Sequence, residues 1–510
     1  MLAILAMLAM LKRLVLVFAV LLVLAGVLYF AAARILGSDL VRSTLEQQLS
    51  ASLGQPVKIG AASAAIYPRV AVDLHSVAIG EPASVTVSRM RVVTGLRPLL
   101  SRRVEEAEVI LSDGELRLPV AFDLIPAPTA PPPNQTPALT IVSIRTIEVR
   151  RLSLVAGTQT WVMDADSTIE GDRLDVNRLS AQSAVTRLQG SGALTSIARN
   201  EGEFTVAADP LDLDELIVFG SALSRPGAKP SSTPAAQPPT PMRVTVKVTA
   251  PSGRFAAQPF RDLATTATLT AGAFSLSPLA LGALGGRFDG RIDADTRKSV
   301  PVLRLNGRID GLDIVEAMKL AGSEGGITGR LGGTVSLSAA GTESATLLRS
   351  ARGTIAAAIT NGTMPRLDLV RPIVLAFGKP SGAPPPGSGS GFSRMGGTFA
   401  LANGVVSTQD LAMAARDFDL TGQGSVELAS GALSARGDVM LSRELTAQAG
   451  VDLRRYAQQD GRVVVPATIG GSLQQPSVAL DVVAATRRAL ENEIQRRAKS
   501  FFDDLFKRKK

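Results

Sequence analysis

Residues 287–314 have the sequence RFDGRIDADTRKSVPVLRLNGRIDGLDI. Apolar and polar side chains alternate in short runs such as 303–305 (LRL), which is the period of a strand with one buried face. These runs are separated by three Asx-Gly steps, which begin at Asp289, Asn306 and Asp310. Asx-Gly tolerates the positive φ that tight hairpin turns require. The stretch therefore predicts short antiparallel strands joined by tight turns.

The same pattern extends over much of the 510-residue chain. Residues 104–118 (VEEAEVILSDGELRL) predict a hairpin that turns at the Asp113-Gly114 step. In residues 72–79 the apolar positions change parity after Leu74, which predicts a β-bulge. Residues 211–223 (LDLDELIVFGSAL) predict a short helix. The predicted fold class is mainly β: a long, curled antiparallel sheet with a few short helices, either an open groove or a closed barrel.

Composition excludes several kinds of site. The chain has no cysteine, which excludes disulfides and thiolate chemistry, and its one histidine, His75, cannot build a multi-histidine metal site. No phosphate-binding loop or nucleophile elbow is recognisable, so we predict that the chain is not an enzyme and needs no cofactor. The net charge is +9, but residues 487–510 hold nine basic and only four acidic residues. This local excess argues against a nucleic-acid surface and for a local contact.

The N-terminus predicts a membrane anchor. Residues 14–33 form a stretch of twenty residues without a charge, which is long enough for a helix to cross a bilayer. Lys12 and Arg13 precede this stretch and favour a cytoplasmic N-terminus. A signal peptide cleaved after 31–33 (AAA) is the alternative, and Met10 is an alternative start. We predict an uncleaved single-pass helix in the inner membrane, with the bulk of the chain in the periplasm.

The C-terminus predicts an amphipathic helix with an apolar stripe flanked by basic side chains. This helix would contact a membrane surface or a partner, or it would cap the end of the sheet. Its candidate contact residues are Leu490, Ile494, Phe501, Phe502, Leu505, Arg496, Arg497 and Lys499.

Two Pro-rich stretches, at 126–138 and 224–241, predict linkers or excursions from the sheet, because proline cannot donate to a strand ladder. The predicted organisation is a membrane anchor (1–38), a helix with strands (39–125), a linker (126–138), a middle β region (139–223), a second linker (224–241), a C-terminal β region (242–480) and the basic helix (481–510).

Two parts of the chain resemble the AsmA family of the Gram-negative envelope. In the first, an anchor is followed by a helix and strands, as in TLEQQLSASLGQPVKIG (44–60), IYPRVAVDLHSVAIG (66–80) and the segment from 85 to 118. The second resembles the C-terminal part of the family, with GGRFDGRIDA (285–294), LRLNGRIDGLDIVEAM (303–318), ITGRLGGTVSLSAAG (327–341), LLRSARGTIAAAITNGTM (347–364) and FALANGVV (399–406). Their order and spacing carry the resemblance.

The resemblance implies a bridge-like lipid transfer protein, in which a curled sheet encloses an apolar β-groove. It implies an inner-membrane anchor, a periplasmic body, phospholipid acyl chains as cargo and a part in outer-membrane homeostasis. The C-terminal helix would contact the outer membrane or an envelope protein. Candidate groove-lining residues are Val57, Ile59, Val72, Leu74, Val109, Leu111, Leu116 and Leu118. The alternative is a scaffold for outer-membrane protein biogenesis that binds strand edges instead of lipid.

Overall fold

The computed structural model describes residues 42, 46, 50, 55–65, 69–95, 103–119, 140–141, 143–222, 242–297, 300–320, 326–365, 371, 389–448, 458–472, 475–480 and 494. The predicted membrane anchor and both Pro-rich stretches lie outside these residues, as does the predicted C-terminal helix apart from Ile494. Among the helices within the described ranges, none has the length and apolar character needed to cross a membrane.

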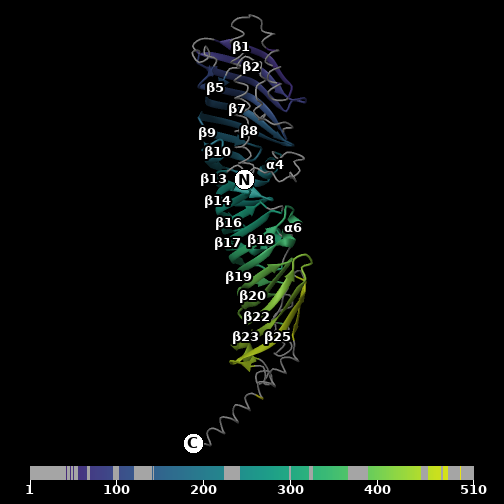
Figure 1. Ribbon diagram of the computed structural model, residues 1–510. Coiled ribbons are helices and arrows are strands. Elements are labelled where there is room, and N and C mark those ends of the chain that lie inside the picture. The colour runs from purple at the N-terminus through teal and green to yellow at the C-terminus, as the bar shows by residue number, and fades with distance from the viewer. Residues whose placement is uncertain are drawn as a thin grey trace, which may run out of the picture. The chain divides into compact units, whose positions relative to one another are not determined.

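The predicted mainly β fold is confirmed, and strands dominate every described part of the chain (Figure 1). The chain divides into two compact units, Met1–Ser277 and Pro278–Lys510. The boundary falls inside the predicted 242–480 region, and β15 (Ala273–Ala283) spans it. Both Pro-rich stretches fall within the first unit, so they do not separate the compact units.

The strands of the first unit are β1 (Val57–Ala65), β2 (Val70–Ile79), β3 (Val85–Thr94), β5 (Ala107–Leu118), β7 (Ile144–Ala156), β8 (Gln159–Glu170), β9 (Arg173–Gln182), β10 (Arg187–Ser196), β11 (Glu201–Ala208), β12 (Leu211–Asp212), β13 (Arg243–Phe255) and β14 (Gln258–Thr270). Apart from the short β12, which pairs with β13, each pairs with the next in this order. The short strands β4 (Arg103–Val104) and β6 (Thr140–Ile141) form a separate pair.

The prediction that the sheet is antiparallel throughout is wrong for this unit. β5 pairs with β7 in parallel, and β11 pairs with β13 in parallel. Parallel neighbours require a crossover connection of a dozen residues or more. Each Pro-rich stretch, 126–138 and 224–241, lies in the connection that makes one of these crossovers. The Pro-rich stretches themselves lie outside the described residues, so their nature as linkers or excursions stays a prediction.

A line of irregular residues crosses the sheet of the first unit. Along neighbouring strands, the alternation of buried and exposed side chains is interrupted once, at positions that lie side by side in the sheet. Ser76, Asp113 and Arg151 lie at these positions and have φ of 53°, 57° and 52°. Pairing of β2 with β3 keeps the same register on both sides of this level. At the same level the pairing of β7 with β8 shifts in register, between Val149 and Leu152. The predicted parity change after Leu74 is confirmed, but the register does not shift there.

The predicted hairpin at 104–118 is wrong. Residues Ala107–Leu118 form one continuous strand, β5, which passes straight through Asp113-Gly114. A tight hairpin turn of this type needs two consecutive residues with positive φ, and here only Asp113 has one. The Asp113 carboxylate accepts hydrogen bonds from Nε and Nη2 of Arg151 on β7, at 2.6 and 2.7 Å. This contact lowers the pKa of Asp113, chiefly through the side-chain hydrogen bond.

The free edge of β1 is bonded by a helical segment that precedes it. The Oγ of Ser50 accepts from the amide of Val57 (2.9 Å), and Oε1 of Glu46 accepts from the amide of Ile59 (2.7 Å). Both side chains lie on one helical face, because they are four residues apart. Unpaired edge amides invite association with other strands, so these bonds protect the edge.

Replacing Glu46 with alanine should make the Ile59 amide exchange with solvent about 10- to 100-fold faster. A hydrogen bond to a charged group contributes about 1.5–3 kcal/mol, and each 1.4 kcal/mol corresponds to a tenfold change. Hydrogen exchange measured by mass spectrometry checks this on the intact chain. Glu46→Gln keeps an oxygen acceptor and should retain most of the protection. Unchanged exchange at Ile59 in Glu46→Ala would show that the bond does not protect the edge.

The predicted helix at 211–223 is confirmed as α4 (Leu213–Ala222). Asp212 caps it, because its Oδ1 accepts from the amides of Asp214 and Glu215 at 2.9 and 3.3 Å. The other carboxylate oxygen of Asp212 binds Arg254 on β13 at 2.5 Å. These bonds fix the start of α4 against the sheet.

The strands of the second unit are β16 (Gly286–Asp295), β17 (Val302–Asp313), β18 (Arg330–Ala340), β19 (Arg352–Met364), β20 (Ser390–Ala402), β21 (Val405–Ala414), β22 (Phe418–Glu427), β23 (Leu433–Leu441), β24 (Gln458–Gln459), β25 (Arg462–Gly471) and β26 (Pro476–Leu480). All their pairings are antiparallel, as predicted, and β24 and β26 both pair with β25. The short helices are α5 (Ile314–Leu320), α6 (Ser344–Ser350) and α8 (Arg443–Gln448).

Most Asx-Gly steps of the second unit lie inside strands, so their prediction as turns is wrong. The three steps at 289, 306 and 310 lie within β16 and β17, and the step at 361 lies within β19. Only the steps at 403 and 460 join strands, and there both residues have positive φ. Two of the glycines inside strands have another use: Gly290 and Gly307 pair with each other, and the ring of Phe288 occupies the space that their side chains would need.

Candidate functional site

The candidate site is the apolar face of the sheet formed by β16–β20. Over 286–294, 303–309, 331–339, 353–359 and 395–401, alternate positions of these strands carry only aliphatic, aromatic, alanine or glycine residues. We define the apolar face by its larger side chains: Phe288, Ile292, Leu303, Leu305, Ile309, Leu331, Val335, Leu337, Ile355, Ile359, Met395 and Phe399. The register brings them together across strands, as in the pairs Ile292↔Leu305 and Val335↔Ile355.

The apolar face is only half-buried. Of its twelve defining side chains, Val335 alone is buried, at 7% exposed, and the others retain intermediate exposure. Inward side chains of the first unit are covered far more completely, as shown by Leu74 and Leu154 at 0%. A contiguous apolar surface left accessible to solvent is unfavourable unless something binds there. The apolar face therefore has the character of a binding surface.

The opposite face of the same strands is strongly polar. Oppositely charged residues face each other across β16 and β17, in the pairs Arg287↔Asp310 and Asp293↔Arg304. Along β16, Arg287 also binds Asp289 at 2.8 Å. That side-chain hydrogen bond lowers the pKa of Asp289, so its carboxylate stays ionised. The polar face is thus the solvent-facing side of the sheet, and the apolar side chains all lie on the opposite side.

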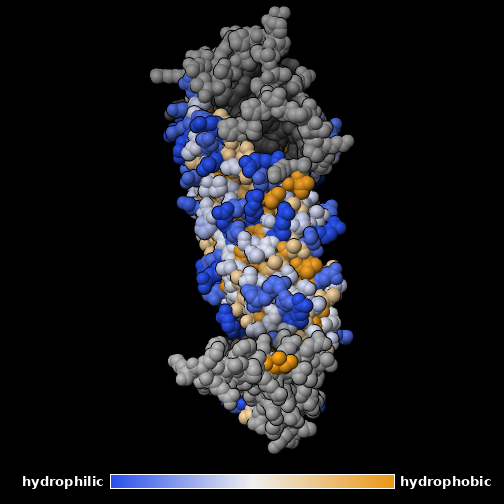
Figure 2. Space-filling model, turned by 60° about the horizontal axis from the view of Figure 1, so that its bottom comes forward, coloured by the Kyte–Doolittle hydropathy of each residue, from blue (hydrophilic) through white to orange (hydrophobic). Residues whose placement is uncertain are grey.

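Figure 2 shows one side of the molecule, where polar side chains cover most of the coloured surface and apolar ones are few. Such a surface is ordinary for a protein in water.

Toward the C-terminus the inward side chains of the same sheet become buried. The buried side chains of β20–β25 form a compact cluster that includes Phe392, Met413, Phe418, Val439 and Val465. The last two are 0% exposed. The accessible part of the apolar face is therefore bounded at this end by an ordinary hydrophobic core, which holds the curved strands in place.

The predicted groove residues lie in the first unit, on β1, β2 and β5. Val57, Ile59, Leu74, Val109, Leu111 and Leu116 are at most 3% exposed, whereas Val72 and Leu118 are half-buried. Their burial is compatible with a packed core and with a narrow groove, so their part in lining a groove stays a prediction.

The remaining predicted site residues are mostly outside the described part. Ile494 lies in a helix and is 60% exposed. Its predicted companions Leu490, Phe501, Phe502, Leu505, Arg496, Arg497 and Lys499 lie outside the described residues, so the C-terminal helix stays a prediction. His75 lies in β2 opposite Ala61 and Arg89. Within the described ranges, no group of histidine and acidic side chains could hold a metal ion.

The sequence contained the signal for the apolar face, but the Asx-Gly steps obscured it. Leu303 and Leu305 alternate with polar residues next to the turn that the sequence predicts at 306. In the structure this step lies inside β17, so the alternation continues along the same strand to Ile309.

Residues 240–461 match the family model of the AsmA family. The match begins just before β13, ends in the turn before β25 and includes the whole apolar face. It confirms the resemblance for this range, whereas residues 43–118 lie outside it. Neither a curated protein nor a solved structure matches the chain.

Proposed function

We propose, on the premise that residues 240–461 are of the AsmA family, that the chain carries phospholipid acyl chains along a hydrophobic β-groove. The apolar face of β16–β20 is the working surface of this proposal. Family membership and a large β-sheet both fit a bridge-like lipid transport protein.

The observation that carries the proposal is the half-buried apolar face itself. Covering an acyl chain removes its methylene groups from water, which contributes about 0.8 kcal/mol for each buried CH₂. Five strands at about 4.8 Å spacing give an apolar surface roughly 20 Å wide, enough to cover much of an extended chain. Charged head groups would stay in water, because moving a charge onto an apolar surface is strongly unfavourable. Movement along such a surface needs no catalytic group or cofactor, so the proposal is of a transport protein without enzymatic activity.

The location belongs to the same proposal. A single-pass inner-membrane anchor at 14–33 would hold the body of the chain in the periplasm, where it would contribute to intermembrane lipid transport and outer-membrane homeostasis. The basic C-terminal segment would contact the outer membrane or an envelope protein. The support is the sequence: an uncharged stretch that is long enough to span a bilayer and a basic, periodically apolar tail.

A photoreactive amino acid placed on the apolar face should become crosslinked to phospholipid. We expect labelled adducts with the probe at Leu305 or Ile355 in the full chain, expressed in cells grown with radioactive phosphate. Probes at Arg304 and Thr354 are matched controls, because each is the neighbouring residue on the polar face. The adduct yield at the apolar positions should be at least tenfold higher than at the controls.

Equal adduct yields on the two faces, or none on either, would contradict the groove. Adducts with nascent outer-membrane proteins in place of lipid would favour the alternative, a scaffold for their assembly.

A further inference from the structure

Two polar groups on the inward face of the first unit have no hydrogen-bond partner among the residues that the structure describes. They are the indole N–H of Trp161 and the side-chain oxygen Oε1 of Gln159, and both atoms are shielded from solvent. The two residues lie two positions apart on β8, so their side chains share a face, with Cα atoms about 6.6 Å apart. Buried polar groups are almost always hydrogen-bonded, and a buried indole N–H usually finds an acceptor. An unpartnered donor beside an unpartnered acceptor points to a ligand.

The surroundings of this pair are apolar. Leu154, which lies opposite Trp161 on β7, is 0% exposed, and Leu152 is 4% exposed. The ring of Phe219 on α4 lies against the indole, with ring centroids 5.4 Å apart. None of these three side chains has a hydrogen-bonding group. The pair is thus a polar point at one end of β8 on a hydrocarbon surface.

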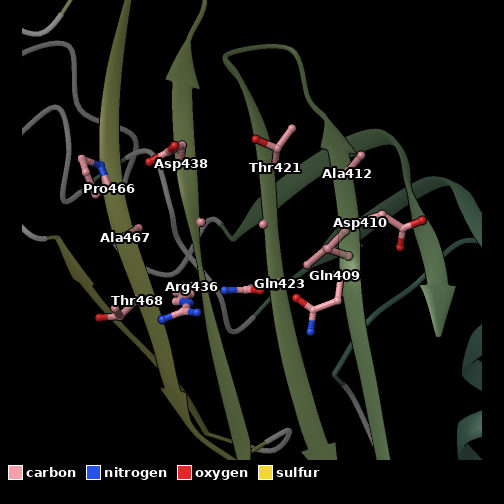
Figure 3. Close-up of a pocket in the computed structure, with 13 residues that line it drawn as sticks. Gln409, Asp410, Ala412, Thr421, Gln423, Arg436, Asp438, Pro466, Ala467 and Thr468 are labelled. Atoms are coloured by element: carbon pink, nitrogen blue, oxygen red, sulfur yellow. The ribbon is translucent and has the colours of Figure 1, made fainter. Parts of the chain in front are cut away.

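A hollow on β21, β22, β23 and β25 shows the opposite condition (Figure 3). It is rich in polar side chains, but these bond one another, since the amide of Gln423 lies between Gln409 and Arg436 and bonds both. Such a surface requires no ligand. The groups of Gln159 and Trp161 are bonded neither to the chain nor to solvent, so a ligand that supplies both partners gains two hydrogen bonds without first breaking any.

From this arrangement we propose that the first unit binds a glycerolipid with a free hydroxyl group beside its ester. The ester carbonyl accepts from the indole N–H of Trp161, and the hydroxyl donates to Oε1 of Gln159. The acyl chain lies along the leucine side chains of the inward face, where its burial is favourable. The inference rests on the proposed function, because it gives lipid a second contact in the chain and names the class of lipid bound there.

The charge next to the pair argues against a fatty acid as the ligand. Glu215 lies one helical turn before Phe219 on α4, and its carboxylate accepts from the hydroxyl of Ser183 at 2.5 Å. A second carboxylate near it would be repelled, because like charges at short range disfavour each other. An ester and a hydroxyl are uncharged and meet no such repulsion.

The ligand reaches the pair by displacing part of α4. This helix buries only Leu216, Phe219 and Gly220, and it leaves Ile217 and Val218 59% and 46% exposed. Elements with few buried apolar contacts open more readily than the strands of a sheet. Shifting α4 therefore costs less than separating β8 from its neighbours.

The test uses Trp161 as the reporter, because it is the only tryptophan in the chain. The full chain in detergent is titrated with lysophosphatidylcholine that carries bromine on its acyl chain, since bromine quenches tryptophan fluorescence at short range. Diacyl phosphatidylcholine with the same brominated chains lacks the free hydroxyl. Half-maximal quenching should occur at about tenfold lower concentration for the lysophospholipid, the effect of one hydrogen bond.

Three variants identify the groups responsible. Gln159→Leu removes the acceptor at similar size and should raise the lysophospholipid midpoint about tenfold, without changing the diacyl midpoint. Thr265→Val is the matched control, because that hydroxyl is also buried without a partner but lies on β14, and it should change neither midpoint. The double variant Trp161→Phe/Val162→Trp moves the indole to the outer face of β8, where neither lipid should quench it.

No quenching by either lipid, equal midpoints for the two, or a midpoint that Gln159→Leu leaves unchanged would overturn the inference. Absence of quenching would assign the pair to a buried water. The photocrosslinks at Leu305 and Ile355 report on the second unit independently. Crosslinks without quenching would therefore remove this site alone, whereas quenching without crosslinks would remove the apolar face of β16–β20 alone.

Discussion

Replacing Leu305 with aspartate should lower the yield of phospholipid adducts at Ile355 about 100-fold. Leu305 lies near the middle of the apolar face, on β17, and Ile355 lies on the same face two strands away. An ionised carboxylate among hydrocarbon costs about 2.5–3.5 kcal/mol, and each 1.4 kcal/mol is a factor of ten in occupancy. The measurement is the photocrosslinking yield with the probe kept at Ile355 and only residue 305 changed.

Two companion substitutions separate an effect on cargo from an effect on folding. Asn306→Asp introduces the same charge one residue along the strand, on the polar face opposite Ser336, and should keep the adduct yield within about twofold of the original. Leu305→Met keeps the position apolar at similar volume and should also retain the adducts, because such swaps usually cost under about 1.5 kcal/mol. An adduct yield that survives Leu305→Asp would remove the apolar face from the proposed route.

The choice of Leu305 follows from a difference between the two units. Leu74 and Val109 are natural sequence-based choices, yet both are at most 1% exposed. A carboxylate at either would destabilise the fold itself, because a buried charge without a partner is strongly unfavourable. Lost lipid binding in such variants would not distinguish a groove from a core. Leu305 is half-buried, so a charge there can be hydrated when no lipid is bound.

The sequence predicts secondary structure correctly in some segments and wrongly in others, depending on whether local residues alone decide the conformation. Two-residue alternation correctly predicts a chain built of strands, and residues 211–223 are correctly predicted to contain a short helix, α4. The prediction that Asx-Gly steps are turns is wrong for most of them, because glycine serves two purposes in this sheet. At Asn403-Gly404 it supports a tight turn, with φ of 52° and 74°. At Gly307 it leaves room for the ring of Phe288, a long-range contact that the dipeptide does not reveal.

Strand direction and exposure were harder to predict for a similar reason. The parallel pairs β5–β7 and β11–β13 depend on where the chain re-enters the sheet after 119–143 and 209–242, and local pattern says little about that. Alternation marks an inward face but not how completely that face is covered. Val109 and Leu305 both lie in alternating runs, yet only Leu305 stays accessible. The candidate site could therefore be predicted as a kind of surface but not located.

Replacing Phe219 with alanine should destabilise the first unit by about 3–5 kcal/mol, the usual cost of deleting a buried phenylalanine. Phe219 is 2% exposed and lies against Trp161 of β8, with ring centroids 5.4 Å apart and planes inclined by 47°. Trp161 belongs to the inward set of β8, so α4 covers the inner face at that point. Losing the phenyl ring opens a cavity beside the indole and weakens the contact that holds α4 on the sheet.

The readout is direct, because Trp161 is the only tryptophan in the chain. Its side chain is 1% exposed, so its fluorescence should shift to longer wavelength when Phe219→Ala admits water, and the urea midpoint of that signal should fall. Ile217→Ala is the matched control on the same helix, since Ile217 is 59% exposed and should change neither quantity. Equal effects of the two substitutions would mean that α4 does not pack against Trp161 through Phe219. A loss confined to Phe219→Ala would establish that α4 covers the inner face of the first unit at Trp161, whereas the apolar face of β16–β20 in the second unit is only half-buried.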